Sequence, residues 1–93
     1  MDVYDYHGPH ADPPQPWAEP VEWERSLPRA DRLRVRAHTC CCRRPLFELC
    51  TAGGLWFVRR MSGEPPADVV ETRWMRERAA KDLWHRILSG QAW

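Results

Sequence analysis

A histidine and four cysteines form the part of this sequence with the clearest chemical potential. Residues 38–42 read His-Thr-Cys-Cys-Cys, and Cys50 follows shortly after. Thiolate and imidazole groups are preferred zinc ligands, and four of them complete a closed tetrahedral site. Because side chains alternate along a strand, His38, Cys40 and Cys42 should share one face, opposite Cys41. The pattern makes His38, Cys40, Cys42 and Cys50 the candidate zinc ligands, with zinc as an optional structural addition and no other cofactor expected.

Other interpretations of the same thiols stay open at this stage. A histidine from the N-terminal region, His7 or His10, could replace Cys50 as the fourth ligand. Structural zinc sites usually contain two paired ligand turns, which this spacing lacks. The thiols could instead pack as small apolar side chains, or Arg43 and Arg44 could activate the thiol of Cys42. Nothing in the sequence identifies a general base, so we expect a protein that is not an enzyme.

Arginine dominates the basic residues and suggests a second kind of chemistry. Planar guanidinium groups suit phosphate and carboxylate recognition. Seven of them fall on predicted strands and turns, with Trp56 available to stack on a base. The candidate nucleic-acid-binding residues are Arg32, Arg34, Arg36, Arg43, Arg44, Arg59 and Arg60. No known nucleic-acid-binding motif is present. Nucleic-acid binding is therefore the alternative function. A solvated basic face is the simpler explanation of these arginines.

Tryptophan supports a third interpretation, which we prefer. The chain has six tryptophans, and tryptophan and arginine are enriched at the centres of protein interfaces. Trp74, Trp84 and Trp93 are the candidate partner-binding residues, although Trp84 also falls within an apolar helix stripe. Trp93 could anchor a partner or a second copy of the chain. We therefore expect a small non-enzymatic adaptor or regulatory protein that binds a protein partner through a basic sheet face and a Trp-bearing C-terminal helix.

Charge divides the chain into two regions. Residues 1–24 contain six acidic side chains, no lysine or arginine, and five prolines. Proline disfavours helix and removes backbone donors, which predicts an extended, disordered acidic tail over residues 1–24. Such a tail would compete with nucleic acid for the basic residues. Its aromatic residues, Trp17 and Trp23 among them, favour docking of part of this segment on the folded domain, which we assign to residues 25–93.

Hydrophobic periodicity places the elements that must position these residues. Alternation over residues 32–38 predicts a half-buried strand, and residues 46–50 and 55–61 predict two more around a glycine-containing hairpin at 51–54. Residues 43–45 read as a turn. Residues 69–75 could be a fourth edge strand or the start of a helix, and we prefer the strand. From Arg76 an apolar stripe predicts a helix that ends at Gly90.

Together these elements predict one α+β domain. It comprises a three- or four-stranded antiparallel meander packed against one C-terminal helix, preceded by the disordered acidic tail. The helix stripe and the inward strand positions should share one core. Its expected members are Leu33, Val35, Leu49, Phe57, Leu83, Trp84 and Ile87.

Three segments also carry a resemblance to other proteins. They are residues 34–42, residues 48–60 and residues 83–90, the last reading Leu-Trp-His-Arg-Ile-Leu-Ser-Gly. Over about residues 33–90 the chain resembles a group of short, uncharacterised actinobacterial proteins. The resemblance implies an intracellular bacterial protein and a shared domain, and it implies no activity. In that group the position of Cys50 is not always cysteine, which argues against an obligatory ligand there.

The ends and the apolar content of the chain bear on its location. The N-terminus lacks the basic and apolar regions of a signal peptide, and no stretch approaches the roughly 20 apolar residues of a spanning helix. We therefore expect a cytoplasmic protein that does not bind a membrane, with its four cysteines reduced.

Overall fold

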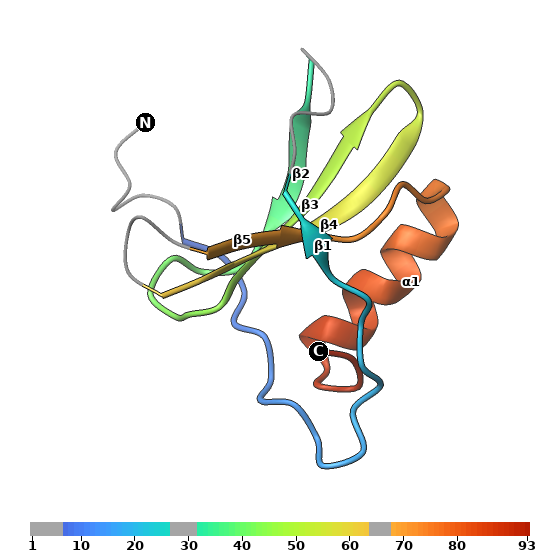
Figure 1. Cartoon of the computed structure of the whole chain (residues 1–93). Helices are drawn as coiled ribbons and strands as arrows, with labels where there is room; N and C mark the ends of the chain where they lie inside the picture. Colours follow the sequence, from blue (N-terminus) through green and yellow to red (C-terminus); the bar gives the residue numbers. More distant parts are fainter. Residues whose placement is uncertain (1–6, 27–31, 64–67) are drawn as a thin grey trace.

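The computed structural model describes residues 7–26, 32–63 and 68–93 of the chain. One antiparallel sheet, with strand order β1-β5-β4-β3-β2, packs against one C-terminal helix, α1 (Figure 1). The elements are β1 (Glu24–Arg25), β2 (Arg34–His38), β3 (Leu46–Ala52), β4 (Leu55–Ser62), β5 (Asp68–Glu71) and α1 (Glu77–Leu88). This confirms the predicted α+β class. The described sheet has five strands because β1, at the predicted domain boundary, adds to β5.

The central hairpin forms where the sequence predicts it. β3 and β4 pair without interruption, from Leu46 opposite Met61 to Ala52 opposite Leu55. Gly53 and Gly54 make the turn with φ of 58° and 81°, a left-handed conformation that suits a two-residue hairpin. β5 confirms the strand interpretation of the following segment, although the strand ends at Glu71 and does not continue to residue 75.

The main core lies between α1 and one face of β3 and β4. Leu49, Leu83, Trp84 and Ile87 are buried there as predicted. The buried members of this core are Phe47, Leu49, Trp56, Val58, Ala80, Leu83, Trp84, Ile87 and Ala92. The helix also forms two i,i+4 ion pairs on its exposed side, Lys81 with Glu77 and Arg86 with Asp82.

Three of the predicted core residues lie elsewhere. Leu49 pairs with Val58, so the neighbouring Phe57 points to the opposite face, where its ring contacts Trp74 at 5.2 Å between centroids. Val35 is 42% exposed because β2 is an edge strand with a neighbour on one side only. Leu33 is half-buried and outside the core cluster. Alternation along a strand indicates which side chains share a face of the sheet, but it does not identify which face α1 covers.

The face of the sheet away from α1 buries an ion-pair network across three strands. Arg59 on β4 donates from Nε to Oε2 of Glu71 at 2.8 Å, and its Nη1 lies 3.3 Å from Oε1 of Glu48. Glu71 is fully buried, and Glu48 is 7% exposed. Burial acts to lower the pKa of Arg59, but hydrogen bonding and the negative charge of Glu71 outweigh it and raise that pKa. Arg59 therefore stays charged and joins β3, β4 and β5.

The segment before β1 lies against the fold; we call residues 7–23 the N-terminal strap. As its prolines predict, it contains no helix, but it is docked rather than free. Asp12 donates its backbone N–H to Leu88 O at 2.8 Å, and Gln15 donates to Gly90 O at 2.9 Å. A Cβ at Gly90 would lie 2.4 Å from Pro13 O, so this approach requires glycine. Residues 1–6 of the predicted tail are outside the described residues.

Removal of the Glu71 charge should reveal how much the buried ion-pair network contributes to the stability of the fold. We expect Glu71→Gln to lower the free energy of unfolding by about 3 kcal/mol, because it leaves a partly buried guanidinium with a weakened partner. Urea denaturation followed by tryptophan fluorescence measures the change. Asp82→Asn, which breaks an exposed helix pair, is the matched control and should cost less than about 0.5 kcal/mol. Equal effects of the two substitutions would contradict a structural role for the network.

Candidate metal centre

The loop between β2 and β3 determines where the cysteines point. β2 ends at His38, and Cys41 and Cys42 lie in a turn. Thr39 closes the loop: its N–H donates to Phe47 O at 2.9 Å, and its Oγ1 accepts the Phe47 N–H at 2.9 Å. The chain therefore leaves the extended conformation before the cysteines. The prediction that Cys41 lies opposite Cys40 and Cys42 is wrong for this reason.

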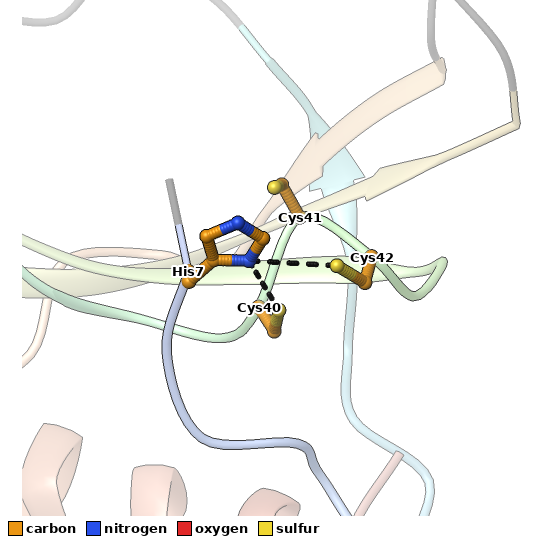
Figure 2. A group of neighbouring side chains, drawn as sticks. All are labelled: His7, Cys40, Cys41 and Cys42. Atoms are coloured by element: carbon orange, nitrogen blue, oxygen red, sulfur yellow. Dashed lines mark hydrogen bonds between the residues drawn. The ribbon is translucent and has the colours of Figure 1, made fainter. Parts of the chain in front are cut away.

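The N-terminal strap brings a histidine to the three consecutive cysteines. Nδ1 of His7 lies 3.3 Å from Cys40 Sγ and 3.4 Å from Cys42 Sγ. One ligand atom from each of His7, Cys40, Cys41 and Cys42 lies within 4.8 Å of the other three. Figure 2 shows the imidazole directed at the cysteine loop. We call these four residues the His-Cys cluster, and they are able to hold a metal ion.

Backbone contacts hold the strap over this loop. The N–H of Cys40 donates to Pro9 O at 3.0 Å. A Cβ at Gly8 would lie only 2.7 Å from the carbonyl oxygen of His38, so the glycine allows the strap to approach β2 closely. His7 is exposed, Cys41 is half-buried, and Cys40 is only 4% exposed. The cluster therefore lies at the surface with its most buried ligand on the protein side.

The electrostatics of the cluster favour one ionised thiol. The pKa of Cys40 is lowered from 9.0 to about 5, first by the backbone N–H of Cys42 and then by hydrogen bonds from His7 and the Gly8 N–H, against the effect of burial. The pKa of Cys42 is raised, mainly by its hydrogen bond to Cys40, and further by burial and the charge on Cys40. These contacts favour the thiolate of Cys40, the form of cysteine that binds metals.

Two of the predicted ligands lie outside the His-Cys cluster. His38 remains on β2, where its Nδ1 lies 3.0 Å from the carbonyl oxygen of Thr39. Cys50 is fully buried on β3, paired with Val35 and Phe57 on the neighbouring strands. The structure instead provides Cys41 and His7. His7 was recognisable only as one of two tail histidines, because no local pattern shows where the strap docks.

The seven candidate arginines do not form one surface. Arg32, Arg34 and Arg36 are exposed and line a common groove beside β2, while Arg43 and Arg44 are exposed in the cysteine loop. The other two are engaged in packing. Arg59 belongs to the buried ion-pair network, and the guanidinium of Arg60 lies 5.3 Å from the centre of the Trp23 ring.

The three candidate partner-binding tryptophans all contribute to packing within the chain. Trp84 is 6% exposed in the core. Trp93 is half-buried with its ring edge against Phe47, 5.2 Å between centroids, and Trp74 packs on Phe57 in the same way. Of the two strap tryptophans expected to favour docking, Trp23 is half-buried, whereas Trp17 is 73% exposed at a turn of the strap.

Comparisons with known protein families, with curated proteins and with solved structures find no match to this chain. Within the described residues, no helix has the length and apolar character needed to span a bilayer. The geometry of the chain is therefore the basis for its functional interpretation.

Ionisation of the Cys40 thiol should be detectable by ultraviolet absorbance in the metal-free protein. Thiolates absorb near 240 nm, so acidification should remove one thiolate's absorbance as the pH falls through about 5. Because the folded pKa lies below the ordinary 9.0, this thiolate stabilises the fold fully above about pH 9, and the contribution is lost as the pH falls toward 5. Cys40→Ser should abolish the transition and Cys50→Ala should keep it. A transition that survives Cys40→Ser would assign the thiolate to another residue.

Proposed function

We propose that this protein is a small, non-enzymatic adaptor or regulatory protein whose fold is closed by one zinc ion bound to His7, Cys40, Cys41 and Cys42. One observation carries the metal assignment. Four soft or borderline ligand atoms, from segments more than thirty residues apart in the chain, lie within 4.8 Å of one another.

The ligand set favours zinc over harder cations. Three thiols and one imidazole form a Cys₃His set, which is common in structural zinc sites, whereas magnesium and calcium require oxygen ligands. Zinc–sulfur and zinc–nitrogen bonds of about 2.3 and 2.0 Å give a tetrahedral N···S edge of about 3.5 Å. The two distances from His7 Nδ1, 3.3 and 3.4 Å, are close to this value. The spacing of His7 from Cys40 and Cys42 is therefore already near that of zinc ligands.

A closed ligand set also supports a structural role for the metal. Catalytic zinc sites keep one position for water or substrate, whereas four protein ligands use all the positions of a tetrahedron. Bound zinc would connect His7 on the strap to the loop after β2. Since such a site is not preformed in the unfolded chain, the free energy of metal binding adds to that of folding. The ion would thus stabilise the docked strap.

The same chemistry bears on location and partners. Zinc-bound thiols require reducing conditions, so we propose a cytoplasmic protein. All four cysteines are free thiols in the structure, which is compatible with this location. An adaptor needs surfaces rather than a catalytic pocket, and the exposed basic residues of β2 offer one to a protein partner.

Metal content and ligand substitution test the zinc site. We expect purified protein to contain one zinc ion per chain by native mass spectrometry. His7→Ala should weaken zinc binding by more than the 10- to 100-fold typical of losing a supporting group around a metal, because it removes a ligand. His38→Ala and Cys50→Ala are matched controls and should keep one zinc ion. The proposed site would be overturned if the two control variants lost zinc while the His7→Ala variant kept it.

Zinc removal should loosen the strap near the site first. With a strong chelator, we expect faster hydrogen exchange at the amide of Cys40, whose hydrogen bond to Pro9 O depends on the docked strap. The amide of Glu19, which donates to Gln91 O far along the strap, should change much less. Exchange measured by NMR resolves the two amides. Equal protection of Cys40 with and without zinc would contradict a role for the ion in strap docking.

A further inference from the structure

A second feature, away from the His-Cys cluster, is a groove beside the edge strand β2. Arg32, Arg34 and Arg36 line it together with the glycine turn at 53–54 and Trp56. The groove has a volume of about 450 Å³. A Cβ built at Gly53 or Gly54 would meet nothing within 4 Å, so the turn leaves the groove open. We call this feature the arginine groove.

The charge of the arginine groove is uncompensated. All three arginines are exposed, and among the described residues no carboxylate forms an ion pair with any of them. Glu77 also lines the groove, but its Oε2 lies 2.8 Å from Lys81 Nζ, so its charge is already paired. Three exposed arginines therefore line one groove, which favours an anionic ligand.

We propose that the arginine groove binds an extended acidic segment of a partner protein, an inference that rests on the adaptor role proposed above. Planar guanidinium groups bind carboxylates through two parallel hydrogen bonds. Arg34 and Arg36 line the same groove as Arg32, so the groove suits a ligand that carries more than one carboxylate.

The β2 edge of the sheet favours recognition of a ligand by side chains rather than by backbone pairing. The register of β2 on β3 shifts between Val35 and Ala37, so Arg36 has no partner residue on β3. Such a bulge disrupts a regular edge and makes it a poor template for an added strand. The exposed guanidinium groups then provide the binding energy, and the carboxylates of the partner provide the specificity.

Nucleic acid is a weaker fit to the same groove. Single-stranded nucleic acid binds through aromatic rings that stack on its bases as well as through basic residues. Trp56 is the aromatic side chain of the groove, and it is only 8% exposed. The ammonium group of Lys81 also lies over its ring, 5.3 Å from the centre. The groove therefore offers positive charge without a free stacking surface.

Fluorescence anisotropy of the full chain with a labelled decapeptide of alternating Glu and Ser tests the proposal. We expect saturable binding, and a peptide with Gln in place of Glu should not bind. Arg34→Gln and Arg36→Gln should each weaken binding about tenfold, the effect of losing one charged hydrogen-bond partner. Arg25→Gln, an equally exposed arginine on the opposite edge strand β1, is the matched control and should change binding less than twofold.

Three outcomes would overturn the proposal. They are no binding of the acidic peptide at low salt, equal weakening by Arg25→Gln and the β2 substitutions, and tighter binding of oligo(dT) than of the peptide. The third outcome would assign the groove to nucleic acid. Thermal unfolding of each variant checks that it folds. Zinc content measured on the same samples is independent of the arginines, so failure of peptide binding and failure of the metal site are distinguishable.

Discussion

Hydrogen bonds between the N-terminal strap and the C-terminal end of the chain constrain the whole molecule. Glu19 N–H donates to Gln91 O, Trp93 N–H donates back to Glu19 O, and Asp12 reaches the last carbonyl of α1. The bond from Asp12 satisfies a carbonyl at the helix end that would otherwise need water. The two bonds of Glu19 pair the strap with the segment after the helix, where the ring of Trp93 contacts Phe47. His7 can reach the cysteines only because the strap is held along this path.

The central strands β3 and β4 are buried on both faces of the sheet. α1 and the strap cover one face, where Trp23 and Trp93 both approach Phe47. The other face buries Phe57 and Cys50 beside the Arg59 network. A small domain buries a limited fraction of its surface, so it gains from using both faces. The buried carboxylates require Arg59 between them, which makes this arginine part of the fold and removes it from any binding surface.

Local patterns were sufficient to predict most elements but not the contacts between distant segments. The hairpin glycines, the alternation of β4 and the stripe of α1 each encode their own structure, and all appear near the predicted positions. The metal ligands were predicted only in part: Cys40 and Cys42 belong to the His-Cys cluster, but His38 and Cys50 do not. The alternation of β2 was extended through Cys42, although the strand ends at His38 and a turn follows. Docking of the strap depends on Gly8 and Gly90 allowing close backbone approach. Hydrophobic periodicity in the sequence does not indicate such a contact.

The two proposed sites lie near the two ends of one strand. Arg34 begins β2 at the arginine groove, and the cysteine loop follows β2 two residues after His38. β2 pairs with β3 alone, so its outer side has no neighbouring strand to support it. A zinc ion that fixes the loop after His38 would therefore hold β2 at one end, where the strap reaches it, while the pairing with β3 holds the rest of the strand.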